Sequence, residues 1–392
     1  MNHYLLLTID VEDWFQVENF KQYIPFASWS SYELRIEKNT HRLLDLLDSV
    51  KLNNSTNLQP VTGSYQVSTE NVPKTKETKK SKKSGKSCQT RPKATFFVLG
   101  WIAERLPNLV REIHSRGHEV ASHGYYHNVC NEQSHEDLKA DLCDCKKLLE
   151  DIIGAPVFGY RAPSFSINND ILKVIEECGY LYDSSYNSFS MHGRYGHLDL
   201  SQNKTRGIAI QISSTKHQKP LPREIFTPLN SKTVQLGHDS DSEVYPVKSL
   251  PNETRSLFNN GKSHFTGAYL TGPKSKIKNQ KSKIFYELPI SNLKFAHQVF
   301  PWGGGGYFRL IPFTLFKIGI KFILGQENAY LFYFHPWEID PDQPKVNDAP
   351  VFYKFRHYIN LSKTHIKLSK LIENFTHCNF ITCSQYLDEV RN

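Results

Sequence analysis

A chain of 392 residues is long enough for one large domain or two ordinary ones. Hydrophobic residues make up 39% and charged residues 22%, which is the composition of a globular protein with a sizeable core. A transmembrane segment is excluded, because the longest apolar run, 310–324, contains a proline and two lysines and falls short of the roughly 20 residues that cross a bilayer. Seven cysteines without a CxxC pair argue against a secreted disulfide framework, and the N-terminus lacks a signal-peptide pattern. We therefore expect free thiols and a cytoplasmic protein.

Two polar segments carry the net charge of +9. Residues 51–93 contain ten Lys/Arg and two Asp/Glu, and residues 200–283 contain fourteen and five. The segments thus hold +8 and +9, which leaves −8 on the rest of the chain. Because the basic character belongs to these segments and the remaining body is acidic, we expect no nucleic-acid partner.

We interpret these segments as insertions into a single domain that spans residues 1–392. The first, 52–92, is rich in Asn, Ser, Thr and Lys and has no apolar periodicity, so it cannot bury enough surface to offset the entropy of ordering. The second, 200–283, is also polar, with short apolar runs that leave room for a hairpin or two. A C-terminal extension follows from about residue 284.

Strand and helix patterns alternate outside the insertions. In chain order we predict a strand at Tyr4–Ile9, a helix at Thr40–Val50, a strand at 94–100, a helix at Ile102–Arg116, a strand at 118–123, a helix at Asp137–Ile153, a strand at Val157–Tyr160, a helix at Ile171–Cys178 and a late strand at Tyr330–Phe334. This alternation indicates an α/β fold with a parallel sheet, open or closed into a barrel. Functional side chains gather at the carboxyl ends of such strands, where Asp10, His123, Arg161 and His335 stand.

A histidine pair and an acidic cluster follow two of these strands. His123 and His127 stand at i and i+4, where one helical turn would let both reach a single ion; the alternative is a pair of surface or capping histidines. The segment 10–13, Asp-Val-Glu-Asp, places three carboxylates after the first strand. These acids either cap a following helix or bind a cation that relieves their mutual repulsion. We predict a divalent metal site at this edge of the sheet, with Asp10 as a base if another acid ligates the ion.

Three further motifs carry residues suited to chemistry. Arg161 precedes a proline-stiffened turn and either pairs with a core carboxylate or orients Asp10. His335 lies in the aromatic segment 333–341, which suits a general acid, although a lone histidine is more often a core residue. The glycine run 303–306 lacks the spacing of a phosphate loop, so we interpret it as a turn that lets substrate approach the backbone.

In this order the motifs resemble those of NodB-type polysaccharide deacetylases, carbohydrate esterase family 4, and most closely the branch associated with exosortase-type exopolysaccharide gene clusters. The shared segments are TIDVEDWF (8–15), KATFFVLGW (93–101), GHEVASHGYYH (117–127), GYRAPSFSI (159–167), YDSS (182–185), GGGYFR (304–309) and FHPWEIDP (334–341). The resemblance implies a distorted (β/α) barrel, a Zn²⁺-type cation and hydrolysis of N-acetyl groups on a GlcNAc-like polysaccharide in exopolysaccharide biosynthesis.

The resemblance also implies roles for individual residues. Mapped position by position, these are metal ligation by His123 and His127, a catalytic base at Asp10, an orienting arginine at Arg161 and a general acid at His335. The family commonly has a second aspartate where Val11 stands, so Glu12 and Asp13 compete as the third metal ligand. Substrate contacts are expected from Tyr125, Pro163 and Trp337. Co²⁺ or another divalent ion would suit the same ligands as Zn²⁺.

Other functions fit the same sequence and are separable by experiment. A catalytically inactive relative would bind polysaccharide through aromatic side chains such as Trp101, Tyr125, Trp302 and Trp337 and release no acetate. A metal-dependent hydrolase of small cyclic amides on this scaffold would leave sugar oligomers intact. Nucleic-acid binding through the Lys-rich stretch 74–93 would depend steeply on salt and disappear when the stretch is deleted.

Overall fold

The computed structural model describes residues 2–53, 90–189, 195–198, 210–212 and 284–391. All of these belong to one compact unit, formed by residues 1–216 and 283–392. The two predicted insertions lie almost wholly outside the described residues, so their predicted disorder and the single-domain organisation stay predictions. Within the second insertion, β6 (Ile210–Ile212) is described, and it pairs antiparallel with β7 (Phe285–Glu287).

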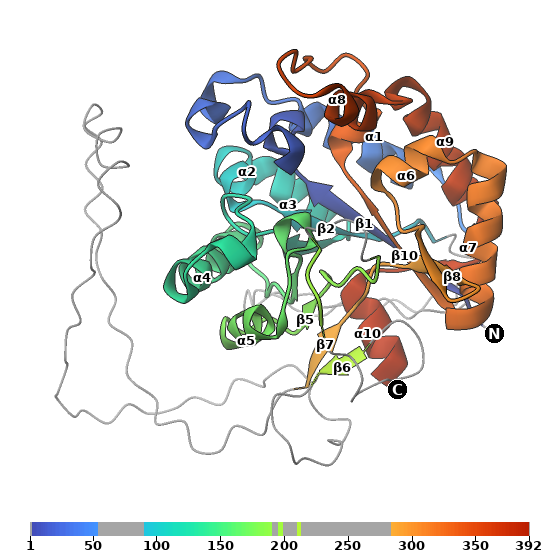
Figure 1. Ribbon diagram of the computed structural model, residues 1–392. Coiled ribbons are helices and arrows are strands. Elements are labelled where there is room, and N and C mark those ends of the chain that lie inside the picture. Colours follow the sequence, from blue (N-terminus) through green and yellow to red (C-terminus); the bar gives the residue numbers. More distant parts are fainter. Residues whose placement is uncertain (1, 54–89, 190–194, 199–209, 213–283, 392) are drawn as a thin grey trace, which may run out of the picture. The chain divides into compact units, whose positions relative to one another are not determined.

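A curled parallel sheet lies at the centre of the unit (Figure 1). The strands follow the order β10-β1-β2-β3-β4-β5-β7-β6, and β11 pairs with β1 beside this path. The parallel strands are β1 (Tyr4–Val11), β2 (Ala94–Val98), β3 (Glu119–Ser122), β4 (Gly159–Tyr160), β5 (Tyr182–Asp183), β7, β10 (Ala329–Phe334) and β11 (Asn379–Phe380). The predicted α/β class, a distorted barrel of parallel strands, is confirmed. A separate antiparallel hairpin is formed by β8 (Asn292–Phe295) and β9 (Gln298–Pro301).

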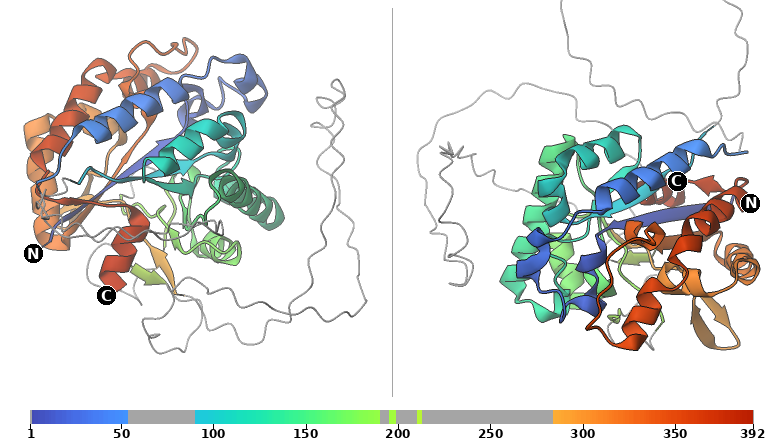
Figure 2. Two further views of the ribbon diagram at one scale, coloured as in Figure 1. Left: turned by 180° about the vertical axis from the view of Figure 1, so that it is seen from behind. Right: turned by 90° about the horizontal axis from the view of Figure 1, so that it is seen from above.

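Helices pack around the outside of the curled sheet, as the views in Figure 2 show. The α-helices are α1 (Ile36–Ser49), α2 (Gly100–Arg105), α3 (Pro107–Ser115), α4 (His135–Ile153), α5 (Asn169–Glu177), α6 (Gly305–Leu310), α7 (Phe313–Glu327), α8 (Val351–Tyr358), α9 (Leu361–Asn374) and α10 (Cys383–Arg391). Short 3₁₀ helices are η1 (Trp14–Gln16), η2 (Glu18–Phe20), η3 (Phe26–Ser31), η4 (Cys130–Glu132), η5 (Pro163–Phe165) and η8 (Pro336–Ile339). No helix in the described ranges has both the length and the apolar character to span a membrane.

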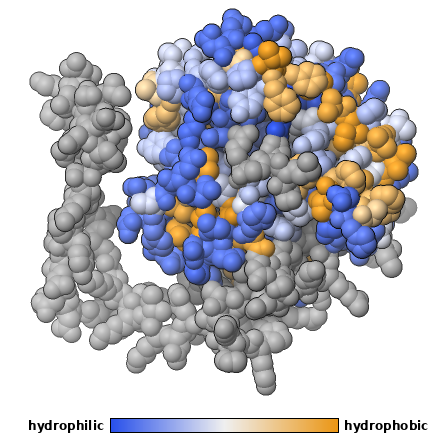
Figure 3. Space-filling view, in the orientation of Figure 1, coloured by the Kyte–Doolittle hydropathy of each residue, from blue (hydrophilic) through white to orange (hydrophobic). Residues whose placement is uncertain are grey.

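The core lies on both faces of the sheet. β1 is buried from Leu5 to Val11, as expected for a central strand of a parallel sheet whose two faces are covered. On the outer surface, Figure 3 shows hydrophilic and hydrophobic residues intermixed, with apolar groups on the side of α7 and the β8–β9 hairpin. Six cysteines among the described residues are free thiols, as predicted.

Two sequence-based predictions of helix are wrong. The predicted helix Ile102–Arg116 is two helices, because Pro107 occupies the first position of α3 and cannot continue the helix before it. The histidine pair was predicted on one helical turn, but residues 123–127 form a loop after β3. Gly124 and His127 have φ angles of +77° and +56°, in the left-handed region that a right-handed helix does not contain.

The strand register brings the functional motifs together. Val11 pairs with Val98, Ser122 with Tyr160, and Ile9 with Phe334, so β1, β3, β4 and β10 all end at the same edge of the sheet. Residues that directly follow these strands therefore lie side by side although they are hundreds of positions apart in the sequence.

Candidate active site

A pocket opens at this carboxyl edge of the sheet. Its lining includes most of the residues singled out in the sequence: Asp10, Glu12, His123, His127, His335 and Trp337. Asp10 lies at the end of β1, and the others come from the segments that follow β1, β3 and β10. The parallel arrangement of the strands explains this convergence, because all these loops leave the sheet at one edge.

Glu12, His123 and His127 form a buried cluster within the pocket. One carboxylate oxygen and one nitrogen from each ring lie within 4.8 Å of one another. His127 Nε2 is 2.7 Å from Glu12 Oε2, and both side chains are buried. Two imidazoles and one carboxylate are the donor set of catalytic zinc sites, so the residues fit a divalent cation.

Hydrogen bonding fixes the first of these histidines for ligation. His123 Nδ1 lies 2.8 Å from the carbonyl oxygen of Arg161, and because a carbonyl only accepts, Nδ1 carries the proton. Its other nitrogen, Nε2, is left with a free lone pair. Burial, reinforced by the neighbouring His127, lowers the pKa of His123 to about 3, which keeps the ring in the neutral form that binds metals.

Glu12 and Asp13, the two candidates for the third metal ligand, lie in different surroundings. The Asp13 carboxylate accepts the backbone N–H groups of Trp14, Arg35 and Ile36 at 2.9, 2.7 and 2.9 Å, and so caps η1 and the start of α1. Burial raises the pKa of Asp13 to about 6, against the effect of these hydrogen bonds. The helix-capping alternative therefore describes Asp13, whereas Glu12 lies in the cluster with His123 and His127.

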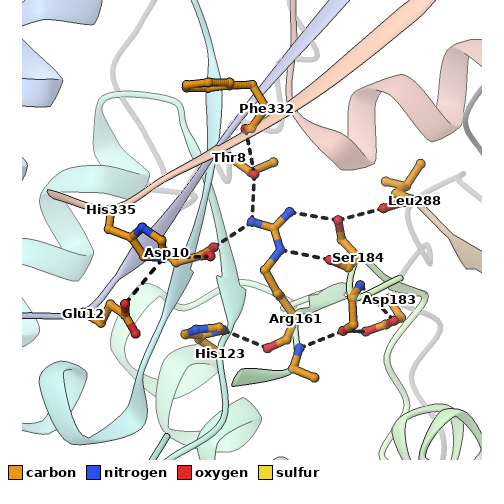
Figure 4. A network of polar contacts seen from close by, with 12 residues as sticks. Thr8, Asp10, Glu12, His123, Arg161, Asp183, Ser184, Leu288, Phe332 and His335 are labelled. Carbon is orange, nitrogen blue, oxygen red and sulfur yellow. Dashed lines mark hydrogen bonds and ion pairs between the residues drawn. The ribbon is translucent and has the colours of Figure 1, made fainter. Parts of the chain in front are cut away.

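Arg161 orients Asp10 through a fully satisfied buried network (Figure 4). Arg161 Nη1 donates to Asp10 Oδ1 at 2.6 Å and to Thr8 Oγ1 at 2.7 Å, while Nε and Nη2 donate to the carbonyl and hydroxyl oxygens of Ser184 at 2.9 Å each. The guanidinium lies 4.1 Å from the centroid of the Phe97 ring. Both alternatives raised for Arg161 hold at once, because the core carboxylate with which it pairs is Asp10.

His335 is held by a carboxylate that the sequence analysis missed. Its Nδ1 lies 2.7 Å from Glu338 Oε1, which also accepts the backbone N–H of His335 at 3.1 Å. The second oxygen of Glu338 lies 3.2 Å from Nε of Arg309, and both of these side chains are buried. The sequence signal was available, since Glu338 stands three residues after His335 on η8, whereas Arg309 is distant in sequence.

The charges around His335 favour its protonated form. Its Nε2 faces Glu12 Oε1 at 3.4 Å and Asp10 Oδ2 at 3.8 Å. Burial opposes a charged ring, but the carboxylates of Glu12, Glu338 and Asp10 outweigh it and raise the pKa of His335 to about 9. Conversely, burial alone would raise the pKa of Glu12, yet the charges of His127 and His335 hold it below its ordinary value. The site thus combines a proton donor with ionised acids.

Only one of the three expected substrate contacts lies in the pocket lining. Trp337 lines the pocket and stacks on His335, with 5.3 Å between the centroids of the two rings. Its Nε1 lies 3.3 Å from Glu12 Oε1. Tyr125 packs against Gly100, where an added Cβ would contact its ring at 2.6 Å, and Pro163 is buried at the start of η5. Neither belongs to the lining. Within the glycine run, Gly305 and Gly306 line the pocket.

Comparison with known proteins gives two family matches. Residues 89–182 match the model of the polysaccharide deacetylases, and this range contains the histidine pair and Arg161. Residues 258–388 match a model described as a domain of unknown function, DUF3473, and this range contains Arg309, His335 and Glu338. The histidine pair and Arg161 thus lie in one family match and Arg309, His335 and Glu338 in the other, whereas Asp10 and Glu12 lie in neither.

Several curated proteins are similar in sequence to part of this chain. It is 30% identical over 170 residues to a peptidoglycan deacetylase-like protein of Gibberella zeae, covering 42% of this chain and 47% of that one. It is 35% identical over 92 residues to a peptidoglycan-N-acetylglucosamine deacetylase of Bacillus cereus, covering 24% and 43%. The chain thus spans less than half the length of these curated relatives.

A solved structure from Mycobacterium smegmatis, provisionally described as a polysaccharide deacetylase, aligns over 99% of this chain and 90% of its own with a TM-score of 0.49 and 14% identity. The family match over residues 89–182, the curated relatives and the order of the motifs show that this part of the chain is similar to polysaccharide deacetylases of the NodB type, carbohydrate esterase family 4.

Proposed function

We propose that this chain is a metal-dependent carbohydrate N-deacetylase that hydrolyses N-acetyl groups on a GlcNAc-like polysaccharide in exopolysaccharide biosynthesis. The observation that carries the proposal is the convergence of a His–His–Glu cluster, a buried Asp–Arg pair and a carboxylate-bound histidine on one pocket. Relatives named as deacetylases of peptidoglycan and chitooligosaccharides support the substrate class.

Glu12, His123 and His127 would hold the cation. A divalent ion at such a site supplies Lewis acidity, which polarises an acetyl carbonyl and makes a water molecule more acidic. Zn²⁺ suits one carboxylate and two imidazoles, and Co²⁺ or another divalent ion is compatible with the same donors.

Asp10 is the base in this proposal. Because Arg161 binds Oδ1, the carboxylate is held in one orientation with Oδ2 on the His335 side, 3.8 Å from Nε2. The other oxygen, Oδ2, is the one free to accept a proton. Asp10 removes a proton from water as the water oxygen attacks the acetyl carbon.

His335 is the acid in this proposal. Its Nδ1–H is bound by Glu338, so the remaining N–H is at Nε2, beside the carboxylates of Asp10 and Glu12. A proton passes from Nε2 to the amide nitrogen as the C–N bond breaks, and acetate and the free amino sugar are released. The stacked Trp337 ring keeps the imidazole plane fixed during this transfer.

The test is to measure bound metal and acetate release on N-acetylglucosamine oligomers, with added Zn²⁺ or Co²⁺. In His123→Ala we expect both to be lost, whereas the exposed control His135→Ala keeps both. Normal metal content in His123→Ala would contradict the proposed site. A wild-type protein that binds metal and oligomer without releasing acetate would be a catalytically inactive relative. Turnover of small cyclic amides, without acetate release from the oligomers, would indicate a cyclic-amide hydrolase instead.

A further inference from the structure

One cation in the pocket lining plays no part in the proposed reaction. Arg356, in the last turn of α8, lines the pocket and is half-buried. Among the described residues no carboxylate lies within ion-pair distance of its guanidinium. The other charged side chains of the lining have such partners: Asp10 with Arg161, Glu12 with His127, Glu18 with Lys21, and Arg309 with Glu338. A half-buried guanidinium without a counter-ion indicates that the pocket supplies one when it is filled.

Two glycines let the backbone pack closely against Arg356 and Tyr333. Gly306 lies directly against it, since an added Cβ there would come within 3.6 Å of Arg356 Cγ and 3.8 Å of Nε. Gly305 likewise lies against the phenol of Tyr333, with 2.6 Å between an added Cβ and the hydroxyl oxygen. Because neither glycine carries a side chain, the backbone lies against the arginine stem and the phenol, and Arg356 and Tyr333 both line the pocket beside this glycine pair.

The position of Arg356 is tied to that of the proton donor. Buried Arg309 donates from Nη2 to the carbonyl oxygen of Arg356 at 2.8 Å and from Nη1 to that of His357 at 2.9 Å. Its Nε contacts Glu338, which in turn binds His335. One fixed guanidinium therefore connects the backbone of α8 to the histidine, so a group bound by Arg356 has a preset position relative to His335.

We propose that Arg356 forms an anion-binding subsite, so that the substrate is an acidic saccharide carrying a carboxylate or phosphate close to the N-acetyl group. This inference rests on the proposed deacetylase function. A guanidinium binds either anion with two parallel hydrogen bonds. It also offsets the repulsion that the ionised acids Asp10 and Glu12 would exert on a negatively charged substrate.

The experiment compares three N-acetylglucosamine tetramers that share one backbone. The first is neutral, the second has its primary alcohols oxidised to carboxylates, and the third has them phosphorylated. We expect the wild-type protein to have a higher kcat/KM on one of the charged tetramers than on the neutral one. Whichever charged tetramer has the higher kcat/KM identifies the anion as a carboxylate or a phosphate. In Arg356→Gln the ratio of charged to neutral kcat/KM falls by about tenfold to a hundredfold, the loss expected for one charge-assisted contact.

The matched control is Lys354→Gln, which removes the same charge from the same helix at a side chain outside the pocket lining. We expect it to keep the preference, because only a direct contact distinguishes the two positions. Equal ratios of charged to neutral kcat/KM in wild type and Arg356→Gln, or a wild-type preference for the neutral tetramer, would overturn the subsite.

If no tetramer is deacetylated, the proposed function fails. In that case calorimetry of the binding of the charged and neutral tetramers tests the subsite by itself. Tighter binding of a charged tetramer that is lost in Arg356→Gln would support the subsite. Equal binding of the charged and neutral tetramers would overturn it.

Discussion

The two parts of the chain that build the pocket contribute differently to it. The N-terminal part, through the turn after β4, supplies the cluster of Glu12, His123 and His127 and the Asp10–Arg161 pair from the ends of strands and the segments that follow them. The C-terminal part, from β7 onward, supplies His335 with its partners Glu338 and Arg309, together with Arg356. Residues 89–182 of the first part match a family model with a stated activity, and residues 258–388 match one without. In the proposed reaction the N-terminal part would activate water, while the C-terminal part would control protonation and the choice of substrate.

The largest expected effect separates two neighbouring acids of the N-terminal part. Glu12→Gln should lose the bound metal and lower kcat/KM by about a thousandfold or more, because a Lewis acid contributes several kcal/mol to the barrier. Asp13→Ala should keep the metal but lose about 2 kcal/mol of unfolding free energy, since three backbone N–H groups lose their acceptor. Metal analysis and urea denaturation check both. Loss of metal from a folded Asp13→Ala protein would contradict this division of roles.

The buried Asp10–Arg161 pair gives the next effect. Arg161→Met should cost about 3–5 kcal/mol of unfolding free energy, because Asp10 would be left buried and charged without a partner. The double variant Asp10→Asn/Arg161→Met should recover part of this stability but no activity, since the base is absent. Urea denaturation of the wild type and both variants measures the difference. A double variant as unstable as Arg161→Met would mean that the pair is not the source of the cost.

A milder effect is expected in the C-terminal part. Glu338→Gln should lower kcat by about tenfold to a hundredfold with normal metal content, because His335 loses the carboxylate that orients it. That carboxylate also raises the pKa of His335, so its removal lowers this pKa and shifts the alkaline limb of the kcat profile to lower pH. Glu338→Asp, which retains the charge, should restore part of both. An unshifted alkaline limb in Glu338→Gln would exclude Glu338 as the partner of the acid.

The smallest effect concerns a buried acid pair behind the pocket. Asp183 and Glu287 are paired in register on β5 and β7, and burial, followed by the other carboxylate, raises the pKa of Glu287 well above its ordinary value. The folded state therefore keeps a proton that the unfolded state releases. The stability that this proton provides is present below the ordinary pKa of about 4.5 and is lost as pH rises toward the raised one. Glu287→Gln should flatten the decline in unfolding free energy between pH 5 and 8, whereas exposed Glu136→Gln should not. The same slope in both variants would contradict this assignment.

The sequence by itself determined the main strands and the edge of the sheet at which the candidate residues lie. Apolar runs mark β1, β2 and β10, and parallel strands must end at one edge, which is where Asp10, His123 and His335 line the pocket and buried Arg161 binds Asp10. The predicted boundaries are close because strand formation depends on short-range hydrophobic pattern. Proline at 107 was likewise a local signal, although the prediction of a continuous helix overlooked it.

Only the tertiary structure decided which polar atoms meet. Glu12 and Asp13 are adjacent in sequence, yet one faces the histidines while the other caps α1, because the chain turns after β1. Tyr125 and Pro163 stand inside matching motifs but pack away from the pocket. The links from Arg309 to Glu338 and to the backbone of Arg356 join residues that no local pattern connects. Such contacts depend on strand order and loop direction, which arise only when the whole sheet assembles.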